Sequence, residues 1–301
     1  MSKREAVKHH YFPKFHLNRW KSADGKLYVY QKQGSGSVKQ SEKDAAQICF
    51  QNKLYTLGPD PLGFEYENPD FVESEFLSKI DNDAAVVLDK MLVSSTFDEL
   101  TEENRRAWAR YIISLLERHP DRIKYSEQLH KEVGDEIIAE KLLRTTNEEK
   151  REIEKCKKMI DEVLYYKTQA RAFLINLIND SEWIESLLAF KWRLINIDRT
   201  QGFHFIVTEA PVFLYKQDSR IYIVAVALDP NNLWVAYLNG WEDDHEILEL
   251  IKAIAMFYNA DLVHKNPEFV VSDRPLSSDK LYQYDNVLQK SLKNVFVNMI
   301  D

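Results

Sequence analysis

The sequence predicts an α+β fold: an N-terminal strand segment, a central long-helix region, and a C-terminal, mainly antiparallel β-meander with flanking helices. Two patterns support this prediction. Between about residues 69 and 190, apolar side chains recur at helical spacing. From Lys191 onward they form short β-branched or aromatic runs separated by turn residues, which is typical of strands. We expect one domain over residues 1–301, with sub-regions 1–68, 69–190 and 191–301.

The N-terminal sub-region contains one clear strand. Residues 26–32 (KLYVYQK) have strand composition and follow the turn dipeptide Asp24-Gly25. Residues 34–37 are a predicted loop, and residues 58–68 are rich in Gly and Pro. The latter segment is therefore expected to be a connector to the helical region.

Two helices with a buried face are predicted next. The first begins at Asn68-Pro69, with Asn as N-cap and Pro at the first helical position, and its apolar residues continue to Met91. The second covers about residues 101–118. It should end there, because His119 precedes Pro120 and is steered away from the helical conformation.

The next two predicted helices of this region contain highly charged segments. Residues 121–144 are predicted to be helical, and Thr146 with Glu149 resembles a capping box that begins another helix, predicted to extend as far as Asn179. Its charged first half is expected to project into solvent or to pair with a neighbouring helix. A short helix over residues 181–190 follows.

The C-terminal sub-region should be mostly strands. The predicted runs are residues 192–197, 203–207, 212–215, 221–227 and 233–238. Residues 240–244 are then a turn and residues 247–258 an amphipathic helix. Residues 260–264 could return as a strand, 272–275 form a turn, and a final helix could follow Leu281.

Composition restricts the class of protein. Hydrophobic residues make up 45% of the chain, which argues against disorder, and the net charge of −8 argues against a nucleic-acid coat protein. Cys49 and Cys156 lie far apart and form neither a disulfide framework nor a Cys-rich metal site. With no leader-like apolar stretch and no membrane-length apolar segment, we expect a cytoplasmic protein.

The most unusual stretch is residues 8–20, KHHYFPKFHLNRW. Three of the eight histidines, His9, His10 and His16, lie within it. Pro13 fixes its own φ angle and favours an extended Phe12, so residues 10–15 should be stiff and strand-like. A stiff backbone can position an imidazole for chemistry. Alternatively, the aromatic side chains close the end of a core while the histidines face solvent.

This stretch resembles the opening of domain of unknown function (DUF) family 4238. The resemblance rests on His10-Tyr11-x-Pro13, a following aromatic residue, Leu17 and the strand over residues 27–30. The family also has an Arg-x-Pro segment with a further Arg, and Arg118, Pro120 and Arg122 are similar. A family strand that ends in Ser-Asp-Asn-Pro corresponds here to Thr208-Glu209-Ala210-Pro211, in which the amide is lost and the acid is longer.

Each of these positions has a structural alternative. An Arg at a helix C-terminus, such as Arg118, is favoured by the helix dipole without any site. Glu209 and Thr208 could simply form a turn that closes a hairpin. A carboxylate at a strand end beside a proline nevertheless suits a metal ligand or a general base.

The resemblance implies two function hypotheses. The first, favoured by a small margin, is a hydrolase, nuclease-like or phosphoesterase-like. His10 would be general base or metal ligand, Glu209 acid or metal ligand, and Arg118 an anion clamp, with Tyr11, Arg122 and Thr208 in binding roles. A divalent metal and a nucleotide or nucleic-acid substrate fit this hypothesis, and it requires His10 and Glu209 to converge in one cleft.

The second hypothesis is a non-catalytic sensor or protein–protein interaction module, for instance in bacterial defence or stress. It predicts an exposed apolar or charged helical face. The sequence contains no P-loop, no His-Glu-x-x-His, no Gly-x-Ser-x-Gly and no dinucleotide fingerprint, so several common enzyme classes lose their best support. Cofactor, partner and oligomeric state stay open at this level.

Overall fold

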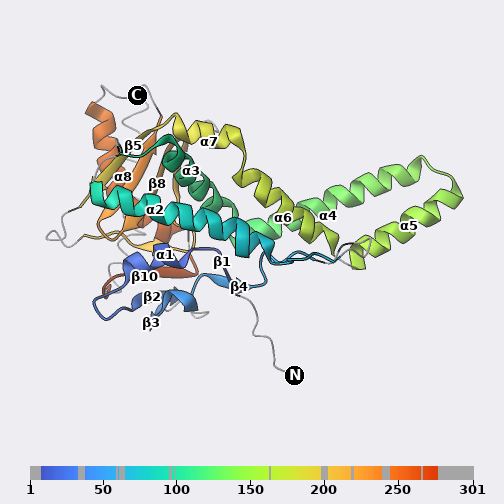
Figure 1. The fold of residues 1–301 in the computed structure, drawn as a ribbon, viewed down its shortest axis with the longest axis horizontal. Coiled ribbons are helices and arrows are strands. Elements are labelled where there is room, and N and C mark those ends of the chain that lie inside the picture. The colour runs from blue at the N-terminus through green and yellow to red at the C-terminus, as the bar shows by residue number, and fades with distance from the viewer. Residues whose placement is uncertain are drawn as a thin grey trace.

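The computed structural model describes residues 8–32, 38–58, 60, 65–94, 97, 99–162, 164–197, 203–217, 220–238, 245–265 and 267–276. These residues form an α+β protein, which confirms the predicted fold class (Figure 1). The strands are β1 (Lys8–His10), β2 (Leu27–Lys32), β3 (Val38–Lys43), β4 (Phe50–Asn52), β5 (Lys191–Asn196), β6 (Val207–Thr208), β7 (Phe213–Gln217), β8 (Arg220–Asp229), β9 (Asn232–Tyr237) and β10 (Phe269–Ser272).

The helices match most of the predicted segments. The α-helices are α1 (Lys14–Leu17), α2 (Ser78–Ser94), α3 (Glu102–Glu117), α4 (Pro120–Leu143), α5 (Asn147–Glu162), α6 (Tyr165–Ile178), α7 (Ser181–Leu188) and α8 (His245–His264). Two 3₁₀ turns, η1 (Asn18–Trp20) and η2 (Ala45–Gln47), and one π-helix, η3 (Val72–Leu77), complete the set.

The strands of the described residues belong to three antiparallel sheets. One sheet has the order β5-β9-β8-β7, so β7, β8 and β9 form the predicted meander and β5 joins its edge. A second sheet has the order β3-β2-β10-β6, and β1 pairs with β4. β6 thus belongs to the second sheet and not to the meander. The chain passes from the second sheet back to the first between Thr208 and Phe213.

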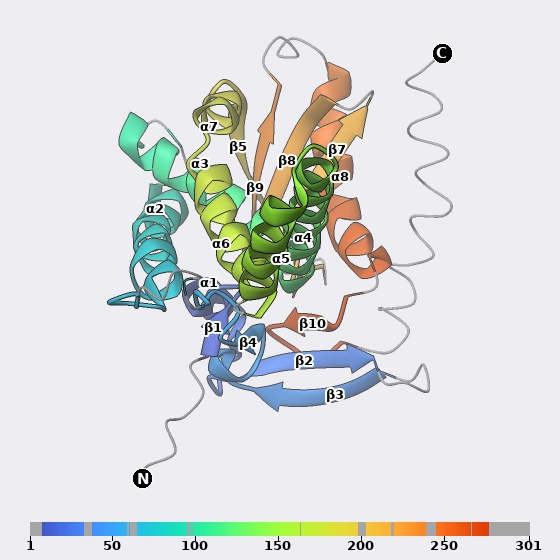
Figure 2. The same ribbon diagram turned by 90° about the vertical axis from the view of Figure 1, so that its right-hand side faces the viewer.

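The central strands of the meander are covered on both faces. Six consecutive residues of β8, Ile223–Leu228, are buried, as expected when helices pack on both sides of a strand. Trp108 of α3 meets Trp234 of β9 with 6.0 Å between ring centroids, while Tyr258 of α8 accepts a hydrogen bond from the Ala227 N–H. α3 and α7 lie on one side of the sheet and α8 on the other (Figure 2).

The N-terminal and C-terminal parts of the chain share the second sheet. β10 lies between β2 and β6, so strands from distant parts of the sequence are hydrogen-bonded neighbours. The main cluster of buried apolar side chains also extends from Tyr11 to Val271. The segment around β10 is therefore an integral part of the core.

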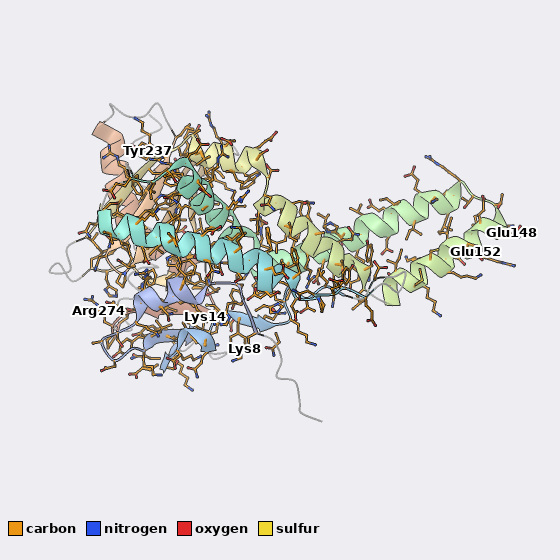
Figure 3. All side chains as sticks on the ribbon, in the orientation of Figure 1. Lys8, Lys14, Glu148, Glu152, Tyr237 and Arg274 are labelled. Atoms are coloured by element: carbon orange, nitrogen blue, oxygen red, sulfur yellow. The ribbon has the colours of Figure 1, made fainter. Side chains whose placement is uncertain are left out.

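Helices α4 and α5 form a hairpin that projects from the rest of the protein (Figure 1). Glu148 and Glu152 mark its far end (Figure 3). Lys157 of α5 pairs with Asp135 of α4 at 2.6 Å, and the predicted capping box at Thr146 and Glu149 is present. We refer to this hairpin, residues 120–162, as the arm.

Three local predictions were wrong. The helix predicted from residue 146 to 179 is two helices, because Leu164 adopts a left-handed conformation (φ 53°) that ends regular helical hydrogen bonding. Residues 260–264 continue α8, in which Ala255, Tyr258 and Leu262 are buried at helical spacing. Residues 14–17 form α1 rather than an extended segment, since the Pro13 carbonyl accepts the His16 and Leu17 N–H groups.

The first long helix also begins later than predicted. Asn68 does cap the Asp70 N–H through its side chain, at 3.1 Å, but the π-helix η3 precedes α2. The predicted loop at residues 34–37, the turn at 240–244 and the helix after Leu281 lie outside the described residues. Among the helices that are described, none is both long and apolar enough to cross a membrane.

Lys53 gives a direct test of local strain. It follows β4, is exposed, and has a φ of 55°, a conformation that costs a non-glycine residue about 1–2 kcal/mol. We expect Lys53→Gly to raise the free energy of unfolding by about 0.5–1 kcal/mol, measured by urea denaturation.

The matched control is Lys39→Gly, at an exposed position in the regular strand β3. There the added backbone freedom should destabilise the protein by about 0.5–1 kcal/mol. Equal effects at both positions would contradict strain at Lys53.

Candidate functional site

Arg118 occupies the centre of a buried polar group between α2, α3 and the N-terminal segment. Its side chain is fully buried, and Nη1 donates to Oδ1 of Asp81 at 2.9 Å. Its carbonyl oxygen accepts a hydrogen bond from the Tyr55 hydroxyl at 2.6 Å. Its guanidinium also lies 5.7 Å from the Tyr111 ring centroid. Nε and Nη2 have no hydrogen-bond partner among the described residues.

His10 and Glu73 lie beside this group and are partly exposed. The His10 backbone N–H donates to Oε1 of Glu73 at 3.3 Å, and the His10 ring packs against Phe50. Burial, with smaller contributions from Lys14 and Lys8, lowers the pKa of His10 to about 4. Burial also raises the pKa of Glu73 to about 7, against the opposing effect of the His10 N–H and of Arg118.

These opposite pKa shifts define what the pair can do chemically. At neutral pH the His10 ring is uncharged and the Glu73 carboxyl is close to its midpoint, so Glu73 can both donate and accept a proton. Glu73 belongs to the π-helix η3, a rare conformation that is often found at functional sites. Structural polar networks also perturb the pKa values of carboxyl groups.

The other two histidines of the opening stretch are buried in the protein interior. His9 accepts the Tyr55 N–H at 3.0 Å and stacks on the Tyr55 ring. His16 contacts the Tyr111 hydroxyl at 2.7 Å and the Ala227 carbonyl at 2.8 Å, and burial lowers its pKa to about 3. His16 therefore connects α1 with both α3 and the central sheet as a neutral ring.

Glu209 is nearly buried, and its carboxylate contacts backbone amides. Oε1 accepts the Glu268 N–H at 2.5 Å and Oε2 accepts the Phe269 N–H at 3.0 Å, which positions the start of β10. Burial raises the pKa of Glu209 despite these hydrogen bonds. Thr208 is buried in β6, and its hydroxyl donates to the Ala210 carbonyl at 3.3 Å.

Tyr11 is buried beside Cys49 and His119. Its N–H donates to the Cys49 carbonyl at 3.0 Å, and its ring edge meets His119. Burial is the main cause that raises the pKa of Tyr11, with electrostatic contributions from Cys49, Glu268 and Glu209. Arg122 has a half-exposed side chain, which pairs with Glu117 at 2.9 Å.

Two of the residues predicted to form a site, His10 and Arg118, are near one another, together with Glu73. Arg118 contributes to the pKa shifts of both His10 and Glu73. Glu209 instead contacts the segment before β10 and affects Tyr11 and Cys49. Within the described residues, no group of three or more His, Cys, Asp or Glu side chains has the arrangement of a metal site.

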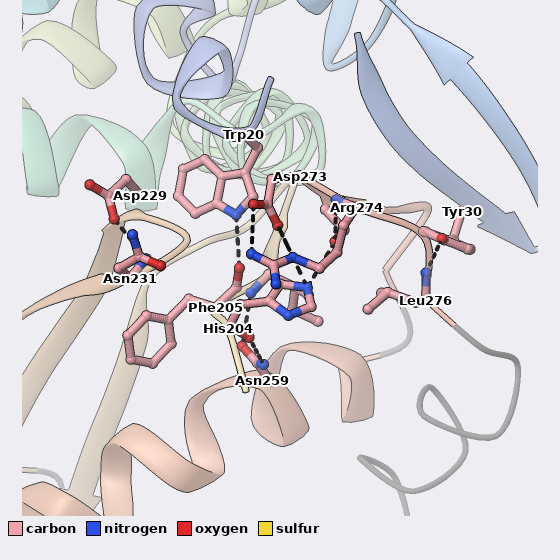
Figure 4. A network of polar contacts seen from close by, with 12 residues as sticks. Trp20, Tyr30, His204, Phe205, Asp229, Asn231, Asn259, Asp273, Arg274 and Leu276 are labelled. Atoms are coloured by element: carbon pink, nitrogen blue, oxygen red, sulfur yellow. Dashed lines mark hydrogen bonds and ion pairs between the residues drawn. The ribbon is translucent and has the colours of Figure 1, made fainter. Parts of the chain in front are cut away.

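A second buried network lies around His204 (Figure 4). Its Nε2 is 2.9 Å from the Ser272 hydroxyl and 3.8 Å from Asp273, so both groups face the same ring nitrogen. A catalytic triad requires the acid and the hydroxyl on opposite nitrogens. Asn259 of α8 receives the Ile206 N–H and donates to the His204 carbonyl. This network ties β10 and α8 to the segment before β6.

Sequence analysis missed Glu73 and Asp81 as members of the polar group. Asp81 lies four residues after Leu77 and three before Ala84, both fully or nearly buried, so it occupies the apolar face of α2. An acid in such a row indicates a buried cationic partner. Glu73 gave no comparable signal, because an acid near a helix start is favoured by the dipole alone.

The fold and this polar group define an α+β protein whose histidine-rich opening packs on a buried arginine. A family model described as "Protein of unknown function (DUF4238)" matches residues 8–228. The chain belongs to this family, which confirms the resemblance seen at His10 and Tyr11. Neither a search of curated proteins nor a search of solved structures returned a match.

The Asp81–Arg118 pair can be tested by removing one charge. Asp81→Asn keeps the size of the side chain but leaves the fully buried guanidinium without an anion, so we expect a loss of about 3 kcal/mol in unfolding free energy. Urea denaturation would measure it.

Asp83→Asn is the control, because Asp83 forms an exposed pair with Lys79 in the same helix and should contribute less than about 1 kcal/mol. Adding Arg118→Met to Asp81→Asn should recover part of the loss. An Asp81→Asn variant as stable as Asp83→Asn would rule out the interpretation.

Proposed function

We propose that this chain is a protein–protein interaction module that associates through its arm. The observation that supports this is a row of exposed apolar side chains on α4: Tyr125, Leu129, Val133 and Ile137, each between 39% and 64% exposed. They recur every four residues over roughly 18 Å of one helix. We call them the apolar row. Isolated surface apolar residues are common, but such a row on a projecting helix suggests an interface.

Charges beside the apolar row favour a second copy of the chain as the partner. Glu132, Glu136 and Glu140 follow the same four-residue spacing on α4 and are exposed. Arg151, Lys155 and Lys158 are exposed and lie on one face of α5. When two arms pack around a two-fold axis, α4 of each copy can meet α5 of the other, and opposite charges then face each other twice.

The expected affinity is weak. If each half-exposed side chain of the row contributes about 1 kcal/mol on burial, two rows contribute roughly 8 kcal/mol. Association costs an estimated 4–15 kcal/mol before side-chain ordering. The proposed dimer should therefore form and dissociate with protein concentration, and because the charge pairs are exposed it should weaken as salt rises.

Sedimentation velocity over a concentration series tests the proposal. We expect the wild-type chain to pass from monomer to dimer, and Leu129→Glu/Val133→Glu to remain monomeric because a charge then replaces two apolar contacts. Val93→Glu is the matched control, since Val93 is an 86% exposed valine on α2, outside the arm.

A charge exchange separates arm pairing from any other dimer. Glu132→Lys/Glu136→Lys should weaken the dimer, and Arg151→Glu/Lys155→Glu in the same chain should restore it. A wild-type chain that stays monomeric throughout, or a Leu129→Glu/Val133→Glu variant that dimerises normally, would contradict the proposal.

The second candidate function is the hydrolase, and one observation favours it. Glu73, with a pKa near 7, lies beside the neutral His10 and the buried Arg118, which suits acid–base chemistry at neutral pH. In this proposal Glu73 exchanges the proton, His10 positions it, and the substrate is a phosphoester of a nucleotide or nucleic acid. The roles suggested for Glu209, Tyr11, Arg122 and Thr208 stay predictions.

The hydrolase candidate makes a pH-dependent prediction. Hydrolysis of bis(p-nitrophenyl) phosphate, assayed with and without divalent metals, should change with an apparent pKa of about 7, the value at which Glu73 ionises. Glu73→Gln should abolish that transition, whereas Glu75→Gln, an exposed acid in the same π-helix, should leave it unchanged. No turnover above background at any pH would exclude phosphodiester hydrolysis at this site.

A further inference from the structure

A pocket of about 450 Å³ lies between α3, α7 and the sheet strands β7 and β8, and its lining does not include His10. Its floor and walls are mainly apolar, with Ile112 and Leu116 from α3, Leu187 from α7 and Val224 from β8. Pockets that take small molecules typically have 300–1,000 Å³ and this kind of lining. The size and lining therefore fit a small molecule better than a protein segment.

The mouth of the pocket combines an aromatic ring with two opposite charges. Trp183 of α7 is 42% exposed there, and Glu182 and Arg220 complete the rim. The Arg220 guanidinium lies 5.7 Å from the Tyr222 ring centroid. In the part of the chain that the structure describes, neither Arg220 nor Glu182 forms an ion pair through its side chain.

We infer that this pocket binds a small molecule with an apolar body and a carboxylate head group. The apolar body fits between Leu116, Leu187 and Val224, where it would remove apolar surface from water. The planar guanidinium of Arg220 can receive a carboxylate in two parallel hydrogen bonds. This site is independent of the arm and of the polar group at Arg118.

Two classes of ligand carry such a carboxylate, and they differ in whether a positive charge lies next to it. A simple carboxylic acid has only the anion, which Arg220 would receive. An α-amino acid also has an ammonium group, which the Glu182 carboxylate could accept at the opposite side of the mouth. The shared chemistry is the carboxylate on an apolar body, and the two sources can be separated with matched probes.

Isothermal titration calorimetry with the full chain tests the inference, using octanoate, 3-phenylpropanoate, L-phenylalanine and octan-1-ol. We expect the carboxylates to bind and octan-1-ol to bind about tenfold more weakly, because it lacks the charge. Trp183 fluorescence should change on binding, and Trp183→Phe should remove that change. L-Phenylalanine binding more tightly than 3-phenylpropanoate would identify the amino-acid source, and the reverse order the simple acid.

Three variants make the result specific. Arg220→Gln should weaken octanoate binding about tenfold and leave octan-1-ol unaffected. Ser186→Trp, at an exposed position that lines the pocket, should abolish binding of every probe by filling the space. Arg193→Gln is the control, because Arg193 is another exposed arginine of this sheet that packs on a tyrosine, at 5.9 Å from the Tyr237 ring centroid.

The inference would be overturned in either of two ways. One is that none of the four probes binds to the folded wild-type chain. The other is that Arg220→Gln and Ser186→Trp, shown by circular dichroism to be folded, bind octanoate as tightly as the wild type does.

Discussion

The buried guanidinium of Arg118 is the constraint on which the surrounding architecture depends. A charge enclosed in a protein interior is costly unless it is paired, and Asp81 of α2 provides the anion at 2.9 Å. This pair fixes the end of α3 against α2, while the Tyr55 hydroxyl holds the Arg118 carbonyl. The Tyr55 backbone N–H in turn donates to Nδ1 of His9 at 3.0 Å. Arg118 thus links the opening stretch, the first two long helices and the loop after β4 in one connected group.

The histidine-rich opening is best explained as an uncharged packing segment that connects the helices with the central sheet. His16 contacts α3 and β8 at once, His9 stacks on Tyr55, and Trp20 donates to the Phe205 carbonyl at 2.9 Å (Figure 4). These contacts connect the layers, and Arg171 of α6 extends the same support to the arm, because it pairs with Glu127 of α4 and donates to the Leu54 carbonyl at 2.6 Å. The exposed apolar surfaces that could bind a partner or a ligand lie elsewhere, on α4 and in the pocket beside α7. Both the apolar row on α4 and the pocket could bind without a change in the conformation of the opening stretch.

Much of the fold could be predicted from the sequence because periodicity and caps act locally. The helix over 102–117 begins at Thr101, which caps the Asn104 N–H, and ends before His119-Pro120 as expected. The break at Leu164 could not be predicted, since neither Gly nor Pro marks it. The pairing of β10 with β2 and β6 depends on contacts between distant residues. For the candidate site, the sequence identified His10 and Arg118 but not Glu73, because the pKa of Glu73 reflects burial among segments that meet only in the folded chain.

The central claim is that the opening histidines are neutral packing groups, with His9 and His16 buried and His10 partly exposed. Its most direct test is an NMR titration of the histidine ring resonances, assigned with His9→Gln, His10→Gln and His16→Gln variants. The account predicts that His10 ionises only near pH 4 and His16 near pH 3, with His9 also below the ordinary histidine value, because burial disfavours the charged ring. Neither His10 nor His16 should titrate between pH 6 and 8. A His10 ring that titrates near pH 6.5–7 would contradict the claim and would favour an acid–base role for the motif.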